Sequence, residues 1–357
     1  MGKGDQSRRH QARVINRAPA IAVIDRRLRP GAAIRAFATL ALAISAAAVD
    51  SAEHANAPAV YPLKPVRLIA AQPAGGNTDV VARLYSQQLS DRLGRQIVVD
   101  NRGGAGGIIA TELVARAEPD GYTLLAVGSS FGANPGLVTK LPYDTRRDFT
   151  PIALLAVGPN VLVLRLAYPA RTVNEIIAAA RAQPGKLNYA SSGVATATHL
   201  AGELFKYLAN IDMQHIAYKG APASLVAVSS GESDLSFAGM SGALPLIRAG
   251  KLRAIAVTTL KRWPNLPDIA TVAESGLPGY DVTNWYGVLG PAKMPADIVA
   301  RLQREIAQIA KLEYVRMRLV ADGLEPSELT PKEFDAHLVR EIAKWIKLAK
   351  AARINID

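Results

Sequence analysis

A short turn in the sequence has the residue types of an anion-binding site; it consists of Pro73, Ala74, Gly75, Gly76, Asn77, Thr78 and Asp79. Its two glycines can adopt positive φ values, and they leave the neighbouring backbone N–H groups accessible. Asn77 or Thr78 can cap a helix that begins there, and the first N–H groups of a helix have no partner within it. Together with the helix dipole, these groups can bind a carboxylate or a phosphate. The same pattern also occurs as a purely structural turn.

This turn lies between a predicted strand and a predicted helix. The apolar run from Val66 to Ala71 indicates a buried strand, and apolar residues recur at helical spacing from Val81 to Leu93. Gly94 can end the helix. Ligands of open α/β sheets bind beyond the carboxyl ends of the strands, which is where we expect this turn to lie.

A second strand–turn–helix unit mirrors the first. A strand is predicted at 187–190, Ser191-Ser192-Gly193 forms a small turn, and Thr196 or Thr198 opens the next helix. Two apolar runs between 151 and 166 are broken by Gly158-Pro159, where we expect the chain to cross to a second lobe. Two such units, each facing a cleft, favour a protein that closes around a ligand over an enzyme.

The remaining pattern alternates strands and helices, and it becomes helical at the end. Thr172 with Glu175, and Thr330 with Glu333, form capping boxes at helix starts. Further strands are predicted at 96–100, 122–127, 213–218, 234–238 and 252–259, with a helix at 107–117. The sequence therefore predicts an α/β protein.

Composition narrows the class of protein. The chain has 357 residues, 49% of them hydrophobic, and its body holds no run of 18 apolar residues, so we expect a soluble globular protein. It has no cysteine, which excludes disulfides, thiolate zinc sites and cysteine nucleophiles. The net charge is +12, but nine Lys and Arg lie in the first 35 residues and no basic block is interleaved with aromatic residues. We therefore expect no nucleic-acid partner.

The first 56 residues have the pattern of a secretory signal. The basic start is followed by the apolar stretch 36–49, which is too short to span a bilayer. Ala55-Asn56-Ala57 offers a small-residue cleavage site. This leader predicts export, and hence a location in the periplasm.

A competing hypothesis is a secreted serine hydrolase that uses Ser130. Gly128-Ser129-Ser130-Phe131-Gly132 fits the G-x-S-x-G nucleophile motif, and His199, His215 and His337 are possible bases. Against this hypothesis, no HGGG-type oxyanion segment precedes Ser130, and Pro135 interrupts the helix that should follow.

Other patterns have simpler interpretations, and we expect neither a cofactor nor a metal. The segment 102–107 fails the G-x-G-x-x-G pattern of dinucleotide binding, and His199 with Glu203 lacks a third ligand at metal-site spacing. Asp79 and Arg83 are spaced for an ion pair within one helix. Trp285 and Trp345 are predicted to be core residues.

Several stretches carry a family resemblance; they include PAGGNTDVVAR, NRGGAGG, PDGYTLL, LPYDTRRDFTPIALLA, PGKLNYASSG, HLAGELF, AYKGAPA, AGKLRAIAVTT and ESGLPGYDVTNWYGVLGPAKMP. In this order they resemble the substrate-binding proteins of tripartite tricarboxylate transporters, the Bug family, over residues 61–357. The resemblance implies a two-lobed, type II Venus-flytrap fold of the periplasmic binding proteins. It also implies capture of a small organic carboxylate by lobe closure: a di- or tricarboxylate, an aromatic acid or an acidic amino acid.

The resemblance also implies an organisation and partners. The leader is 1–56, the first lobe comprises 57–158 and 259–357, and the second lobe is 159–258. We expect hinges at Gly158-Pro159 and Thr258-Thr259, a monomer, and possible partners in the membrane subunits of a transporter. A binding protein that serves signalling is the alternative.

Family positions map onto particular residues of this sequence. Besides the turn at 73–79, the implied ligand-binding residues are Ser129, Ser130, Ser191, Gly193, Thr196, Ala197, Thr198, Tyr218 and Ala238. Ser129 and Ser130 would line the floor of the cleft, and Tyr218 and Ala238 the wall of the second lobe. The chain departs from the family at Gln72, where an aromatic residue is usual, and at Ala195 and Ala197, where glycine and a hydroxyl residue are common.

Overall fold

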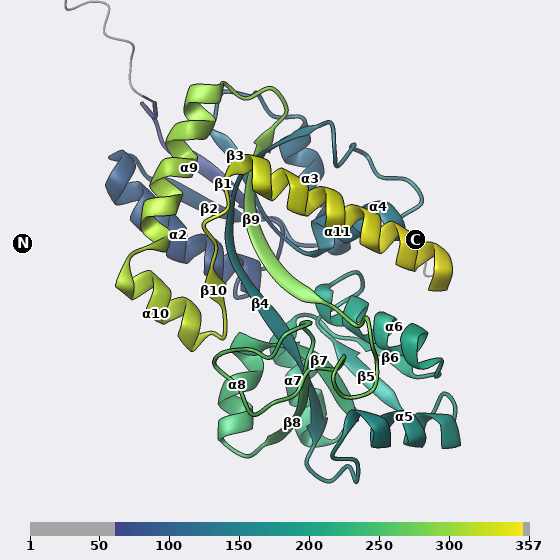
Figure 1. Cartoon of the computed structure of the whole chain (residues 1–357). Coiled ribbons are helices and arrows are strands. Elements are labelled where there is room, and N and C mark those ends of the chain that lie inside the picture. Colours follow the sequence, from purple (N-terminus) through teal and green to yellow (C-terminus); the bar gives the residue numbers. More distant parts are fainter. Residues whose placement is uncertain (1–60, 353–357) are drawn as a thin grey trace, which may run out of the picture. The chain divides into compact units, whose positions relative to one another are not determined.

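A computed structural model describes residues 61–352 and has the predicted α/β fold (Figure 1). Its ten strands follow the order β2-β1-β3-β9-β4-β7-β5-β6, and β10 and β8 also pair with β4. The strands are β1 (Val66–Ala70), β2 (Ile97–Asn101), β3 (Thr123–Gly128), β4 (Phe149–Arg165), β5 (Asn188–Ser191), β6 (Gln214–Ala217), β7 (Leu235–Gly239), β8 (Leu252–Val257), β9 (Thr283–Pro291) and β10 (Glu325–Pro326).

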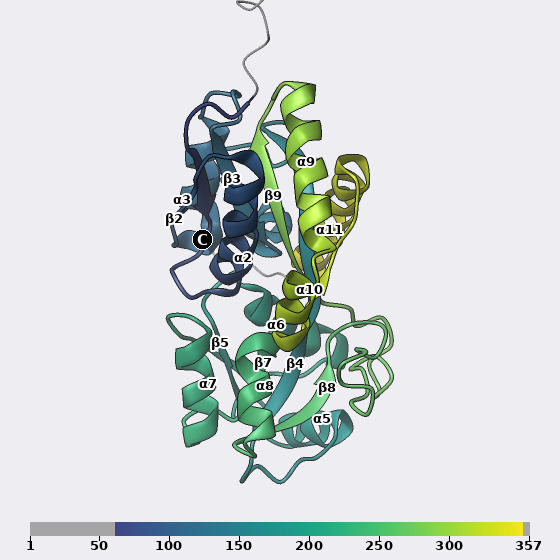
Figure 2. The same cartoon turned by 90° about the vertical axis from the view of Figure 1, so that its left-hand side faces the viewer.

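The strands form two lobes that share β4. In the first lobe, β1 pairs in parallel with β2 and β3, and β9 runs antiparallel between β3 and β4. In the second lobe, β5 pairs in parallel with β6 and β7, while β7 and β8 run antiparallel to the far end of β4. The predicted break between two apolar runs at Gly158-Pro159 is wrong. Strand β4, 17 residues long in all, passes through both residues without a break and enters both lobes (Figure 2).

Helices cover both lobes. Those of the first lobe are α2 (Asn77–Leu93), α3 (Ile108–Ala115), α4 (Ser130–Leu137), α9 (Ala296–Ala310), α10 (Glu313–Ala321) and α11 (Pro331–Ala352). Those of the second lobe are α5 (Val173–Ala182), α6 (Ala197–Ala209), α7 (Ala221–Ser230) and α8 (Met240–Arg248). Trp285 and Trp345 are fully buried, which confirms that both are core residues.

The crossing between the lobes is tied by buried polar contacts. Thr258 Oγ1 accepts the Asn160 N–H at 2.8 Å, and the Thr258 N–H donates to the Asn160 carbonyl at 3.0 Å. The same hydroxyl lies 2.6 Å from the Val282 carbonyl. Because these residues belong to β4, to the segment after β8 and to the segment before β9, three passes of the chain meet at one place. The predicted lobe boundaries at 158 and 258 stay a prediction.

The last helix joins the two lobes through apolar packing. Trp345, Leu348 and Ala349 of α11 share one buried core with Leu200 and Leu204 of α6. The C-terminal end of α11 therefore contacts the second lobe, although its first half packs on the first lobe through Phe334 and Leu338.

The start of α11 confirms a local prediction, and the start of α2 does not. Thr330 and Glu333 form the expected capping box, with the Thr330 N–H donating to Glu333 Oε2 at 2.8 Å and the Glu333 N–H to Thr330 Oγ1 at 3.3 Å. Helix α2 instead begins after Gly76, and neither Asn77 nor Thr78 caps it with a side chain.

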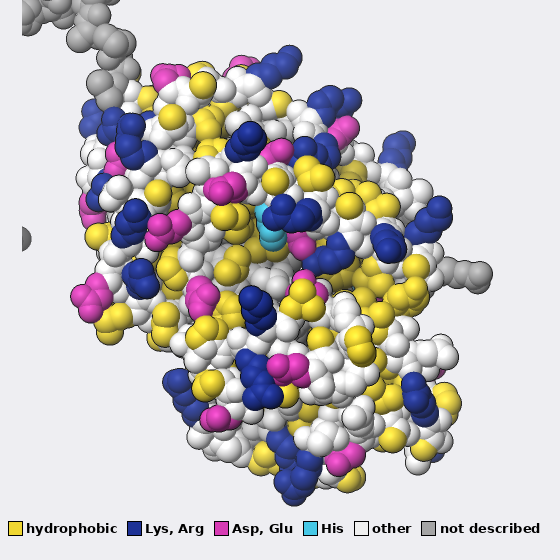
Figure 3. Space-filling view, viewed as in Figure 1, with side chains coloured by type: hydrophobic (Ala, Val, Ile, Leu, Met, Phe, Trp, Pro, Cys, Tyr) yellow, Lys and Arg dark blue, Asp and Glu magenta, His cyan; other side chains and the backbone are white. Residues whose placement is uncertain are grey.

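Two further expectations concern the ends of the chain and its surface. The predicted signal, residues 1–56, lies outside the described residues. From Tyr61 onward, none of the described helices has the length and apolarity needed to cross a bilayer. On the face drawn in Figure 3, Lys and Arg side chains are scattered among acidic and apolar ones rather than gathered into one patch.

Candidate functional site

The predicted turns have the same backbone conformation at positions 120 residues apart. Gly75 has φ +79° and Ala195 has φ +62°, both in the left-handed region. The next residues, Gly76 (φ −71°, ψ 158°) and Thr196 (φ −75°, ψ 160°), are extended, and each immediately precedes a helix. Since both turns follow the carboxyl end of a parallel strand, each lobe presents the start of a helix at an equivalent place.

Three N–H groups of the first turn donate hydrogen bonds to the turn itself or to the residue before it. The Gly75 N–H donates to Asp79 Oδ2 at 2.8 Å, and the Gly76 N–H donates to the Pro73 carbonyl at 3.1 Å. The Thr78 N–H donates to Gln72 Oε1 at 2.9 Å. Gln72, the residue that departs from the family, thus places an uncharged oxygen at the start of α2.

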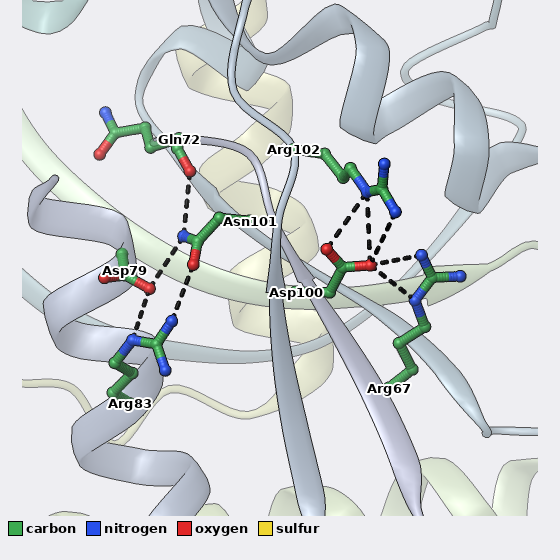
Figure 4. Close-up of polar contacts among 7 residues, drawn as sticks. All are labelled: Arg67, Gln72, Asp79, Arg83, Asp100, Asn101 and Arg102. Atoms are coloured by element: carbon green, nitrogen blue, oxygen red, sulfur yellow. Dashed lines mark hydrogen bonds and ion pairs between the residues drawn. The ribbon is translucent and has the colours of Figure 1, made fainter. Parts of the chain in front are cut away.

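A polar network supports the first turn from below (Figure 4). Asp79 Oδ1 lies 2.8 Å from Arg83 Nε, which confirms the predicted ion pair. Asn101 donates to Asp79 Oδ1 at 2.9 Å and to the Gln72 carbonyl at 3.1 Å. Asn101 also accepts from Arg83 at 2.7 Å. The Asp79 carboxylate is buried, so these partners hold its charge in place rather than exposing it to a ligand.

A separate charge cluster lies beside this network. Asp100, the neighbour of Asn101 on β2, accepts hydrogen bonds from Arg67 and Arg102, and Arg67 above all lowers the pKa of its carboxyl (Figure 4). A shallow groove along the surface of β1 and β2 is lined partly by these residues, and it includes none of the predicted site residues. We therefore assign it no part in the site.

The second turn is held by hydroxyl groups and imidazoles. Thr198 Oγ1 accepts the Ser192 N–H at 2.9 Å and lies 2.9 Å from Thr196 Oγ1, which donates to the Gly193 carbonyl at 2.7 Å. The Ala195 N–H donates to His199 Nδ1 at 3.2 Å. His199 thus has the same place in the second turn as Asp79 has in the first.

The two lobes touch at these turns. Ser241 of α8 donates to Asn77 Oδ1 at 3.0 Å, and a Cβ at Gly239 would lie 2.5 Å from Asn77 Nδ2. Gly106 of the first lobe lies against Ala195 of the second. A Cβ at Gly106 would lie 3.0 Å from the Ala195 Cβ, so this contact between the lobes also requires a glycine. Sequence reasoning missed Ser241, because nothing in its local pattern shows that it lies opposite Asn77.

The other predicted residues lie in different surroundings. Ser129 is buried, accepts the Trp285 N–H at 3.1 Å and lies 3.4 Å from the Thr283 carbonyl, so it joins α4 to β9. The Tyr218 hydroxyl donates to Glu232 at 2.9 Å, and Ala238 packs in the apolar core of the second lobe. Ser130 and Ala197 each begin a helix and are half-buried. The contribution of each to ligand binding stays a prediction.

The histidines do not support a hydrolase centred on Ser130. His199 bonds to Ala195, His215 lies 2.6 Å from Ser191 Oγ, and His337 stacks with Phe334. Each ring is therefore engaged elsewhere, and between residues 61 and 352 no hydrogen bond joins a histidine to Ser130. Within the same range, no three His, Asp or Glu side chains are grouped as metal ligands.

Comparisons with known proteins agree with this geometry. A family model described as "Tripartite tricarboxylate transporter family receptor" matches residues 81–354. The chain belongs to this receptor family. BugT of Bordetella pertussis is 32% identical over 313 residues, which cover 87% of this chain and 95% of BugT. The predicted membership of the Bug family is therefore confirmed.

Solved structures share the receptor's fold. The R. palustris protein Rpa4515, solved with adipate, is 35% identical with a TM-score of 0.78, and the match covers 83% of this chain and 100% of that one. MatC of Rhodopseudomonas palustris, solved with bound malate, is 32% identical with a TM-score of 0.76, over 81% of this chain and 99% of that one. The receptor has the two-lobed fold of the periplasmic solute-binding proteins.

Proposed function

We propose that this receptor captures a small organic dicarboxylate in the periplasm, between the turns at 73–79 and 191–198, and that closure of its lobes retains the acid for uptake. Adipate and malate, the acids bound by the two structural relatives, are the first candidates. The membrane subunits of a tripartite transporter are the proposed recipients.

The observation that carries the proposal is the pair of equivalent turns, one in each lobe, at the place where the lobes touch. Each turn ends at a helix start, where the dipole and the first backbone N–H groups favour an anion. A dicarboxylate has two anionic ends, which suits two such helix starts. A single carboxylate would leave one of them without an anion.

The chemistry of the turns supports recognition by neutral donors. The side chains nearest to the second turn are hydroxyls and neutral imidazoles, and the charge of Asp79 is compensated by Arg83. Burial of a neutral hydrogen-bond donor costs less desolvation free energy than burial of a Lys or Arg side chain. Neutral donors also allow release of the ligand once the lobes open.

Calorimetry with the mature chain tests the proposal. Adipate, malate, citrate, benzoate and glutamate are titrated at pH 8, with adipamide as a matched ligand of the same length without charge. We expect saturable binding of at least one dicarboxylate and none of adipamide. Absence of binding across all five acids, or equal binding of adipate and adipamide, would contradict the proposal.

A further inference from the structure

Two histidines stack directly beneath the second turn. The rings of His199 on α6 and His215 on β6 lie 4.1 Å apart at an angle of 27°. Tyr189 of β5 also stacks on His215, with ring centroids 4.9 Å apart. His199 is buried and His215 is half-buried, so this stack belongs to the support of the turn rather than to the surface.

The two imidazoles anchor both halves of the turn. His199 Nδ1 accepts the Ala195 N–H, and His215 Nε2 lies 2.6 Å from Ser191 Oγ. Ser191 Oγ in turn accepts the Gly193 N–H at 3.2 Å. The hydrogen bonds of the stack therefore reach from the first to the fifth residue of the turn.

The turn needs this support because its backbone is unfavourable. Ala195 has φ +62°, a conformation that costs a residue with a Cβ roughly 1–2 kcal/mol. At the matching position of the first turn the residue is Gly75, for which the cost does not arise. The hydrogen bond to His199 thus offsets a strain that the first turn does not have.

We infer that His199 and His215 are positioning residues, which as a neutral pair hold the second turn in its ligand-binding conformation and which release the turn, and with it the carboxylate, when acid protonates them. This inference rests on the proposed function, and it adds a dependence on pH.

The chemical reason is the single lone pair on His199 Nδ1. An imidazolium carries a proton there and can only donate, so it would face the Ala195 N–H with a second donor. Two imidazolium rings stacked 4.1 Å apart would also repel each other.

The surrounding charges do not remove this constraint. Glu203 of α6 is the acidic group near the pair, but it accepts from the Tyr189 hydroxyl at 2.6 Å and from Lys206 at 3.1 Å. Burial lowers the pKa of His199 and lowers that of His215 to about 4. Since a histidine freed from the stack regains a pKa near 6.5, the stabilisation is complete above about pH 6.5 and is lost as the pH falls toward about 4.

Adipate binding is measured by calorimetry from pH 8 to pH 5 on four proteins: the wild type, His199→Asn, His199→Leu and His337→Asn. Asparagine keeps an oxygen near the position of Nδ1 but does not titrate. His337 is a matched control, because it is a partly buried histidine in the first lobe that stacks with Phe334. Because the four proteins are compared at the same pH, the protonation of adipate affects all four affinities equally.

We expect the affinity of the wild type to fall about tenfold more than that of His199→Asn over this range, which corresponds to about one pKa unit. His199→Asn should bind nearly as well as the wild type at pH 8, His199→Leu should bind weakly at every pH, and His337→Asn should follow the wild type. Parallel pH profiles for the wild type and His199→Asn would overturn the inference.

A second measurement needs no ligand. Amide NMR of the ligand-free wild type follows the Ala195 N–H from pH 8 to below pH 4, and we expect its shift and its protection from exchange to change as the histidines titrate. An unchanged Ala195 signal overturns the inference even where no acid binds. Failure of the proposed function would instead appear as absence of binding of all five acids at pH 8, or as equal binding of adipate and adipamide, whatever the Ala195 amide signal does.

Discussion

In the function proposed above, the side chain of Gln72 would compete with the ligand for an N–H group of the first turn. The N–H groups of Gly75 and Gly76 are bonded to Asp79 and to the Pro73 carbonyl, both fixed parts of the turn. The Thr78 N–H is bonded to the end of the Gln72 side chain, which can rotate away. A carboxylate that displaces this amide oxygen would gain a charge-assisted hydrogen bond in its place. Exchange of one acceptor for another costs less than opening the turn.

Replacement of Gly75 by alanine tests the first turn. Gly75→Ala places a side chain at φ +79°, where a Cβ meets nothing within 4 Å, so the cost is backbone strain of roughly 1–2 kcal/mol in the free energy of unfolding. Gly94→Ala is the matched control, because Gly94 has φ +65°, equally open space and a place at the far end of α2.

Urea denaturation should show similar losses for the two variants, while calorimetry should show weaker adipate binding for Gly75→Ala only. Equal adipate affinities for the two variants would mean that the first turn does not contact the ligand. Gly76 is less informative, since its φ is −71° and a Cβ there would collide with Gln72 Oε1 at 2.8 Å. Of the two glycines of the first turn, only Gly75 adopts a positive φ.

Among the elements, those specified by local patterns could be predicted from the sequence. The strand–turn–helix units and the capping box at Thr330 depend on residues close in the chain, and the structure has them with bounds shifted by one or two residues. Strand β9 was missed, because its apolar run at 285–291 carries no alternation and its two neighbours, β3 and β4, are more than a hundred residues away.

The site was only partly predictable for the same reason. Glycines and hydroxyls near a helix start are visible in the sequence, but their hydrogen-bond partners are not. Gln72 and His199 lie close to their turns in the sequence, but their hydrogen bonds to Thr78 and Ala195 depend on the turn geometry. Ser241 becomes relevant only through the fold, which brings it to Asn77. Family resemblance supplied positions such as Tyr218, whose hydroxyl bonds to Glu232 and whose part in ligand binding stays a prediction.

The contact between α2 and α8 yields a prediction for these two helices. Ser241→Ala removes the hydrogen bond to Asn77 between the lobes, which is worth about 1 kcal/mol, so the dissociation constant for adipate should rise about fivefold. Ser229→Ala is the control, since Ser229 bonds only within its own helix, to the Val226 carbonyl. Calorimetry that finds the two variants equal would show that this contact does not stabilise the ligand-bound state.

On the scale of the whole described structure, closure of the lobes should be measurable in solution. The lobes touch near Asn77 and Ala195, while three passes of the chain and α11 connect them at the other side. We expect the radius of gyration from small-angle X-ray scattering to fall when adipate is added. An unchanged radius at saturating adipate, with binding shown by calorimetry, would contradict capture by closure.

The position of β9 has a consequence for the order of folding. This strand, residues 283–291, separates β3 from β4 in the sheet, so the first lobe cannot complete its sheet until most of the chain has left the ribosome. Such long-range pairing slows folding, whereas a lobe made of one continuous segment could fold during synthesis. With this strand order the sheet of the first lobe stays incomplete through most of translation, and an incompletely folded polypeptide is one that can be passed through a membrane pore.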